Sequence, residues 1–251
     1  MHSNKYVLVF VFIMTTVVAL VLSGMSIGLK DVHDRNEAIF NKKAILSSIE
    51  SHLGENIKAS DIPDQEVLDI FDNSIKQLVV DMKGNVIPQE EVDATYKGGL
   101  AENVDMSKEK KKDPADRMLP VFIYNKDNGK KFYIVSVRGI GLWDEIWGSV
   151  ALEDDFKTVA GAAFDHKGET PGLGAEIKDN PTFAKQFMGK SLYNSEGDFT
   201  SVVVRKGGAV DEMTEVDGIS GATVTCDGVS DMLYSGIKLY QSYFDKTKSS
   251  I

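Results

Sequence analysis

Residues 121–137 have the sequence VFIYNKDNGKKFYIVSV, two apolar runs on either side of a polar turn at 125–129. Runs of β-branched and aromatic residues that flank a short turn containing Asn and Gly are typical of two antiparallel strands. The stretch therefore predicts a β-hairpin, and the other elements are assigned outward from it.

Other short apolar segments favour further strands. A second hairpin is predicted from residues 78–80 and 86–87, which flank a turn at 81–85. Single strands are predicted at 148–152, 159–164 and 201–204. The charged run at 108–114 is expected to be a solvated loop.

Three segments have apolar or aliphatic positions at helical spacing, which ordinary packing against a core explains. They cover 34–49, 64–78 and the C-terminal end, with stripe positions Ile39, Lys42, Lys43, Leu46 and Ile49; Val67, Leu68, Phe71, Ile75 and Leu78; and Val229, Met232, Leu233, Ile237, Tyr240 and Phe244. Paired strands mixed with helices, without a regular βαβ alternation, predict an α+β body with an antiparallel sheet.

Charge is distributed very unevenly along the chain. The 24 residues from Tyr6 to Leu29 carry no charged side chain, and a helix of that length reaches ~36 Å, enough for a hydrocarbon core of about 30 Å. The 222 residues from 30 to 251 hold 27 basic and 38 acidic side chains, a net charge of −11. Such an acidic body binds phosphate backbones poorly, so nucleic acid is excluded as a partner. One cysteine, Cys226, excludes an internal disulfide.

We expect residues 1–29 to be a retained transmembrane anchor rather than a cleaved signal peptide. The apolar run at 6–22 is longer than a usual signal-peptide core, and no clear small-x-small cleavage site follows it. Residues 30–251 are expected to form one domain outside the bilayer, in which 30–60 include a helix next to the membrane. A count of the flanking cations, Lys30, Arg35, Lys42 and Lys43 against Lys5, favours a cytoplasmic body.

Common catalytic motifs are absent from the sequence. There is no dinucleotide-binding GxGxxG, no phosphate-binding loop that ends in Lys-Ser/Thr and no GxSxG elbow. The four histidines lack the spacing of metal ligands, and nothing in the spacing supports a Cys226–His166 pair or a hydrolase built on acids near Glu169. No catalytic side chain and no metal site is predicted.

Three glycine-rich segments remain as candidate binding elements. Residues 139–148, GIGLWDEIWG, hold both tryptophans, which either pack in a corner or wall a flat aromatic ligand. Residues 168–176, GETPGLGAE, contain a Pro-Gly turn, and a turn alone would explain them. Residues 217–228, DGISGATVTCDG, precede the C-terminal helix. The start of a helix presents free N–H groups to a phosphate, although an ordinary turn and N-cap use the same residue types.

The segment DGISGAT at 217–223 resembles the flavinylation motif of a family of FMN-binding membrane subunits. That family comprises the C subunits of Na+-translocating NADH:quinone oxidoreductases and the related G subunits of Rnf electron-transport complexes. Four further features occur in the family's order: the single N-terminal span, the helix that ends with KKAIL at 42–46, GLW at 141–143 and ETPGLG at 169–174. The GLWD block and the chain length favour the quinone-reductase group, and the resemblance covers nearly the whole chain.

The resemblance implies one FMN, joined covalently through a phosphoester to Thr223. It also implies that a separate flavin transferase takes FMN from FAD, with Asp217 and Gly218 as recognition elements. The expected cofactor-binding residues within a flavin site at 139–251 are Thr223, Ser220, Gly221, Ala222, Thr225, Asp217, Leu142, Trp143, Thr170, Gly172 and Leu173. Thr225 is the competing acceptor, and Cys226 is expected to be a packing residue.

The same resemblance implies an electron-transfer subunit of a Na+-pumping NADH:ubiquinone oxidoreductase, which acts with other integral-membrane and redox subunits. A flavin accepts electrons one at a time, so the protein holds the ring and tunes its potential. The family places the body in the periplasm, anchored in the lipid of the bacterial inner membrane, against the cation count above. No charge within the span could form an ion path, so translocation is expected in partner subunits. A G-type Rnf subunit and a membrane-anchored flavin-binding sensory ectodomain are the alternatives.

Overall fold

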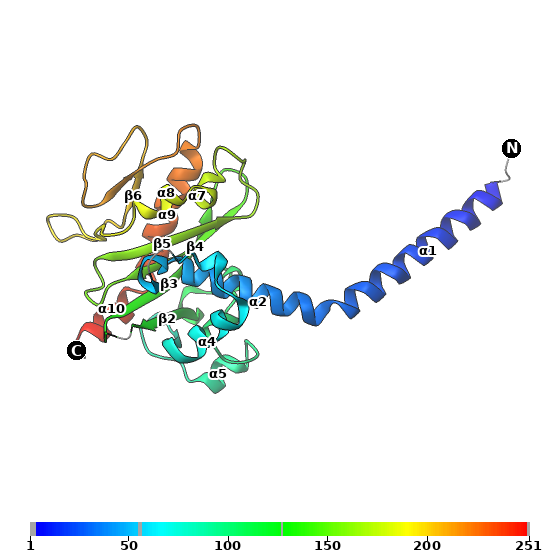
Figure 1. Ribbon diagram of the computed structural model, residues 1–251, viewed down its shortest axis with the longest axis horizontal. Helices are drawn as coiled ribbons and strands as arrows, with labels where there is room; N and C mark the ends of the chain where they lie inside the picture. The colour runs from blue at the N-terminus through cyan, green and yellow to red at the C-terminus, as the bar shows by residue number, and fades with distance from the viewer. Residues whose placement is uncertain (1–3, 55–56, 127, 250–251) are drawn as a thin grey trace. The chain divides into compact units, whose positions relative to one another are not determined.

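The computed structural model of the protein describes residues 4–54, 57–126 and 128–249. The chain divides into two compact units, one that ends at Phe40 and one that begins at Asn41. In the first unit, helix α1 (Asn4–Gly28) has a mean hydropathy of 2.7 in its most apolar window and no buried residue. By length and composition, it is the one helix among the described residues that could cross a membrane (Figure 1).

Helix α2 (Lys30–Ser47) follows α1 and extends from the first unit into the second. It confirms the helix expected from residue 34 onward, although it ends two residues before Ile49. Leu46 and Ile49 are both buried, as their spacing predicts.

The second unit is built on a five-stranded sheet in which every neighbouring pair is antiparallel. Its strands, in spatial order, are β1 (Ile75–Val80), β2 (Leu119–Asn125), β3 (Lys131–Ile140), β4 (Glu145–Leu152) and β5 (Val159–His166). The hairpin predicted from residues 121–137 is β2–β3, with Val121 opposite Val135 and Tyr124 opposite Phe132. Residue 127 of its predicted turn lies outside the described residues. The expected α+β fold with an antiparallel sheet is confirmed.

Helix α4 (Asp64–Ser74) is shorter than the helix expected over 64–78. The prediction is wrong from Ile75 onward, because Ile75 and Leu78 pair with Tyr124 and Val121 in the sheet. As a strand, residues 75–80 form a continuous ladder of backbone hydrogen bonds with β2. As a continuation of α4, they would leave the edge of β2 without a hydrogen-bonded partner strand. The expected hairpin over 78–87 is reduced to one bridge between Val80 and Val86.

The C-terminal segment forms two helices, α9 (Thr223–Lys238) and α10 (Gln241–Lys248), where one was expected. The chain turns at Tyr240, whose buried hydroxyl donates a hydrogen bond to the carbonyl oxygen of Ser136 at 3.0 Å. The strand expected at 201–204 begins later, as β6 (Val203–Arg205), and pairs in parallel with β7 (Glu215–Asp217), which was not predicted.

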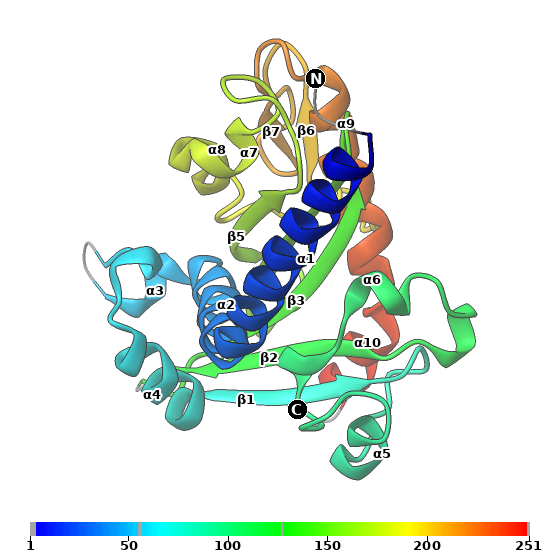
Figure 2. The same ribbon diagram turned by 90° about the vertical axis from the view of Figure 1, so that its right-hand side faces the viewer.

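Helices cover both faces of the sheet (Figure 2). Along β3, Tyr133, Val135 and Val137 belong to the core shared with α9, whereas Phe132 and Ile134 belong to the core shared with α2 and α4. This alternation is the two-residue period of a strand buried on both sides. The remaining short elements are α3 (Glu50–Leu53), α5 (Gln89–Asp93), α6 (Met106–Glu109), α7 (Glu176–Asp179), α8 (Pro181–Lys185) and the 3-10 turns Ala59–Asp61, Ala101–Asn103 and Pro114–Asp116.

The charged run at 108–114 is only partly the solvated loop that was expected. Glu109 is fully buried at the end of α6. Its carboxylate accepts hydrogen bonds from the Tyr96 hydroxyl and from the backbone N–H of Met118, and pairs with Lys112 at 2.7 Å. The prediction is wrong for Glu109, since these three partners offset the cost of burying its charge.

Candidate functional site

The first glycine-rich segment forms the turn between β3 and β4. Gly141 N–H donates to the carbonyl oxygen of Asp144 at 2.9 Å and closes the turn. Trp143 is 68% exposed, next to the exposed Leu142. Trp147 lies instead on β4, where the Arg138 guanidinium packs 5.1 Å from its ring centre. The two tryptophans therefore have different surroundings, and Trp143 is the one available to a ligand.

The second segment follows β5 and contains the expected turn. Gly172 has φ +75°, a backbone conformation that favours glycine, and Leu173 N–H donates to the Thr170 carbonyl oxygen at 3.1 Å. The indole N–H of Trp143 donates to the Thr170 hydroxyl at 3.1 Å. The first and second segments therefore contact each other through two predicted site residues.

The third segment runs from the end of β7 to the start of α9. Gly221 has φ +78°, and a Cβ atom there would lie 2.7 Å from Leu173 Cδ2. A Cβ atom on Gly228 would collide with the carbonyl of Ile140, so α9 lies directly against the first segment. The fold thus brings all three glycine-rich segments to one place.

Glu169 connects these segments through its buried carboxylate. Its Oε1 accepts a hydrogen bond from the backbone N–H of Trp143 at 2.9 Å, and its Oε2 accepts one from the Thr225 hydroxyl at 2.6 Å. The backbone N–H of Glu169 donates to His166 Nδ1 at 3.1 Å. A Cβ atom on Gly141 would lie 2.5 Å from Oε1, and one on Gly174 would collide with Oε2. Both glycines are therefore needed for the carboxylate to reach its partners.

The two candidate acceptor threonines differ in exposure. Thr225 is 1% exposed, and its hydroxyl is engaged by Glu169. Thr223 is half-buried at the first position of α9, and its hydroxyl has no hydrogen-bond partner within residues 4–54, 57–126 and 128–249. A hydroxyl that reacts with a bulky substrate must be accessible, so the arrangement favours Thr223.

The start of α9 has no side-chain cap. Cys226 N–H donates to the Ala222 carbonyl, but the N–H groups of residues 223–225 find no acceptor in the described part of the chain. Three unpaired donors and the positive end of the helix dipole favour a phosphate at this position.

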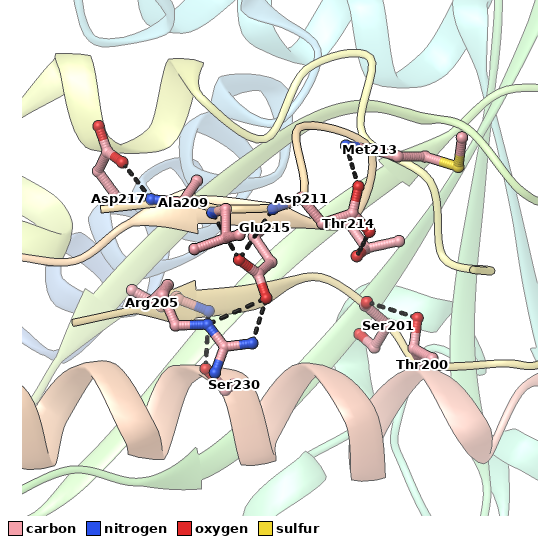
Figure 3. A network of polar contacts seen from close by, with 12 residues as sticks. Thr200, Ser201, Arg205, Ala209, Asp211, Met213, Thr214, Glu215, Asp217 and Ser230 are labelled. Carbon is pink, nitrogen blue, oxygen red and sulfur yellow. Dashed lines mark hydrogen bonds and ion pairs between the residues drawn. The ribbon is translucent and has the colours of Figure 1, made fainter. Parts of the chain in front are cut away.

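Asp217 and Gly218 are held in place by their neighbours. Asp217 accepts a hydrogen bond from the Ala209 N–H at 2.7 Å, and its own N–H donates to the Gln186 side chain at 2.8 Å. Gly218 N–H donates to the Arg205 carbonyl at 2.9 Å. Figure 3 shows Asp217 beside the loop that joins β6 to β7.

Glu215 organises that loop from β7. Its carboxylate binds the Arg205 side chain and accepts hydrogen bonds from the N–H groups of Val210 and Asp211 at 2.8 and 3.2 Å (Figure 3). The Arg205 hydrogen bond, with the backbone N–H groups, lowers the pKa of Glu215 from 4.5 to about 2. The loop behind the DGISGAT segment is therefore fixed by charge-assisted hydrogen bonds.

Cys226 packs as expected at the base of the site. It is buried, its Sγ accepts a hydrogen bond from the Ile219 N–H at 3.3 Å, and burial raises the pKa of its thiol. The remaining predicted residues, Ser220, Gly221, Ala222, Gly172 and Leu173, all belong to the two turns that face each other, and the exposed Leu173 adjoins Gly221.

Sequence reasoning missed Glu169, Gly141 and Gly174 as site residues, although the first and last lie within the ETPGLG block and Gly141 opens the GLW block. Their role depends on hydrogen bonds across 26 and 56 positions of the chain. No local pattern predicts contacts of that range.

A model of the FMN-binding domain family matches residues 141–238. The chain is 31% identical to the C subunit of the Na+-translocating NADH-quinone reductase of Vibrio campbellii, over 86% of this chain and 84% of that protein. It is 29% identical to the protein of the same name from Pseudomonas aeruginosa over 93% and 91%.

Two solved structures resemble the fold. The crystal structure of the C subunit of the Na+-translocating NADH-quinone reductase from Parabacteroides distasonis has a TM-score of 0.71 and 33% identity, covering 86% of this chain and 96% of that one. The crystal structure of Shewanella oneidensis NqrC has a TM-score of 0.67 and 28% identity, covering 87% and 99%. Sequence similarity over most of both chains, the FMN-binding match and the shared fold lead to one conclusion: this chain belongs to the family of C subunits of Na+-translocating NADH-quinone reductases.

Proposed function

We propose that this chain is the FMN-carrying electron-transfer subunit of a Na+-translocating NADH-quinone reductase, with one FMN attached through a phosphoester to Thr223. The observation that carries the proposal is the contrast between the two threonines at the start of α9. The Thr225 hydroxyl is buried and hydrogen-bonded to Glu169, whereas Thr223 is only half-buried and its hydroxyl, at an uncapped helix N-terminus, has no hydrogen-bond partner among the described residues.

The surroundings of Thr223 fit both ends of FMN. The free N–H groups of residues 223–225 match a phosphate group. The exposed apolar side chains of Leu142, Trp143 and Leu173 match a flat aromatic ring, since covering them removes apolar surface from water. Thr170, already hydrogen-bonded to the Trp143 indole, and Gly172 complete the proposed contacts.

Attachment needs a flavin transferase with FAD as the donor. The bond between Thr223 Oγ and the flavin-side phosphorus forms, the pyrophosphate bond of FAD breaks and AMP leaves, while a base on the transferase takes the hydroxyl proton. Glycine and alanine at 221 and 222 leave the approach to Thr223 open. Asp217 and Gly218 are the residues that the transferase recognises in this proposal. Their backbone N–H groups are held by hydrogen bonds to the Gln186 side chain and the Arg205 carbonyl oxygen.

When bound, FMN supplies one-electron chemistry between other redox groups of the complex. The chain's own residues hold the phosphate, cover the ring and keep the cofactor from dissociating. No side chain is assigned as a general acid or base.

We further infer that residues 1–29 anchor the chain in the lipid of the bacterial inner membrane and that 30–251 form a periplasmic FMN-binding domain beside integral-membrane partner subunits. The length and apolar composition of α1 support the anchor. A covalent link supports a location outside the cytosol, where a dissociated flavin would be lost.

In-gel fluorescence tests the attachment residue. The chain is produced with a flavin transferase, denatured and separated by electrophoresis. The native sequence and Thr225→Val are expected to fluoresce, because the Thr223 hydroxyl is intact in both, and Thr223→Ala is expected to be dark. A fluorescent Thr223→Ala with a dark Thr225→Val would move the attachment to Thr225.

A further inference from the structure

Glu169 is a buried carboxylate whose hydrogen-bond partners are neutral groups. Its side chain contacts the Trp143 N–H and the Thr225 hydroxyl, and in the described part of the chain no Lys or Arg forms an ion pair with it. Lys178, which lies nearby in sequence, pairs with Asp165 instead. Removal of a charge from water without an opposite charge to compensate is unfavourable.

A neutral residue of the same shape would satisfy much of the geometry. The amide oxygen of a glutamine could accept from the Trp143 N–H, and its NH2 group could donate to Thr225 Oγ, because a hydroxyl both donates and accepts. The packing around Gly141 and Gly174 therefore requires the shape of the side chain but not its charge. Packing and hydrogen bonding therefore do not explain why position 169 holds a charged glutamate rather than a neutral glutamine.

We propose that Glu169 is the positioning residue of the flavin site, and that its negative charge lowers the reduction potential of the flavin that Trp143 and Thr223 hold. The carboxylate fixes the Trp143 turn against the first turn of α9, so both parts of the site keep one relative position. Reduction adds negative charge to a flavin, and a fixed negative charge with little solvent around it opposes that change. This inference rests on the proposed attachment of FMN to Thr223.

Two substitutions separate position from charge. Glu169→Gln keeps an acceptor for the Trp143 N–H and removes the charge, whereas Glu169→Ala removes both. Asp179→Asn is the matched control, because it removes an exposed carboxylate on the neighbouring helix α7. All variants are made in the full chain.

Position is measured without flavin, by hydrogen exchange of the Trp143 amide in the Thr223→Ala background. The acceptor of this amide is Glu169 Oε1, so its exchange reports on that hydrogen bond directly. We expect Glu169→Ala to exchange about tenfold faster or more, as the loss of a hydrogen bond to a charged group allows, and Glu169→Gln to retain most of the protection.

Charge is measured with flavin, as the midpoint potential of the flavinylated protein. Glu169→Gln is expected to shift the potential upward, and Asp179→Asn is expected to leave it unchanged. An unchanged potential in Glu169→Gln overturns the proposal even if the amide exchange responds, and unchanged exchange in Glu169→Ala overturns it as well. If Glu169→Ala does not fold, the potential of Glu169→Gln decides alone.

Failure of the proposed function gives a different result. If Thr223→Ala still binds flavin covalently, the attachment residue is wrong, whereas the exchange of the Trp143 amide, measured in protein produced without a flavin transferase, still tests the positioning role.

Discussion

At the scale of single residues, the site depends on places where a side chain is missing. The carboxylate of Glu169 fits between Gly141 and Gly174, and the Leu173 side chain occupies the space that a Cβ atom on Gly221 would need. Gly221 also adopts a positive φ, so both the lack of space for a side chain and the backbone conformation favour glycine at this position. The three glycines, which the sequence placed in candidate binding segments, are close-contact positions in the fold.

Gly174→Ala tests this close contact. The added methyl would collide with Glu169 Oε2 and lie 2.6 Å from Thr225 Oγ1. Neither neighbour is free to move, because each is the other's hydrogen-bond partner. We expect a loss of about 1–3 kcal/mol in the free energy of unfolding, the usual effect of overpacking, and a lower yield of flavinylated protein.

Gly168→Ala is the control for this substitution. Its added methyl meets no atom within 4 Å, and its φ is not in the left-handed region. Chemical denaturation should show a change within about 1 kcal/mol for this variant. If both substitutions lowered the free energy of unfolding equally, the loss in Gly174→Ala could not be assigned to the collision with Glu169.

At the scale of elements, α9 connects the site to the rest of the domain. Its first turn carries Thr223 and Thr225, and its later apolar residues Val229, Met232 and Leu233 are buried in the core shared with the sheet. The loop between β6 and β7 supports the segment that precedes this helix, through the Glu215 and Asp217 hydrogen bonds. The position of Thr223 therefore depends on two separate tertiary contacts.

The pH dependence of stability should reveal the Glu215 network. Arg205 and the backbone N–H groups of Val210 and Asp211 hold the pKa of Glu215 at about 2 in the folded protein, below its ordinary value of 4.5. A carboxyl group whose pKa is lowered by folding contributes stability above its unfolded pKa and loses that contribution as pH falls through its folded pKa. We expect the native protein to lose thermal stability between about pH 4.5 and 2 more steeply than Glu215→Gln, as followed by circular dichroism. Parallel curves for the two proteins would contradict this.

At the scale of the whole molecule, two units serve different proposed roles. The first ends at Phe40 and contains the apolar helix α1, and the second begins at Asn41 and contains the sheet and the three glycine-rich segments. Since the second unit holds both cores, residues 41–251 have what a domain needs to fold.

Membrane topology is the prediction at this scale. The full chain should remain in the membrane fraction through a high-salt wash and leave it only with detergent, because burial of α1 in lipid does not depend on charge. An alkaline phosphatase fused to the C-terminus should be active and a fused green fluorescent protein dark, if the body lies in the periplasm. An inactive phosphatase with a fluorescent green fluorescent protein would instead place the body in the cytoplasm, as the count of flanking cations favours.

Local sequence was sufficient to specify the antiparallel hairpin at 121–137, the apolar N-terminal helix and the identity of the glycine-rich segments. These depend on local periodicity and turn chemistry, which neighbouring residues specify. The motif at 217–223 also indicated the family, which the similarity to its known members confirms.

How those segments meet depends on long-range packing. Residues 75–80 became a strand because β2 lay beside them, and Glu109 became buried because Tyr96, Met118 and Lys112 surrounded its carboxylate. Glu169 likewise engages Thr225 rather than Thr223 because a hydrogen bond across 56 positions is set by the packing of α9 on the sheet. Such contacts join residues that are distant in sequence. Local sequence patterns therefore cannot predict them, because the stabilising free energy comes from partners outside the local window.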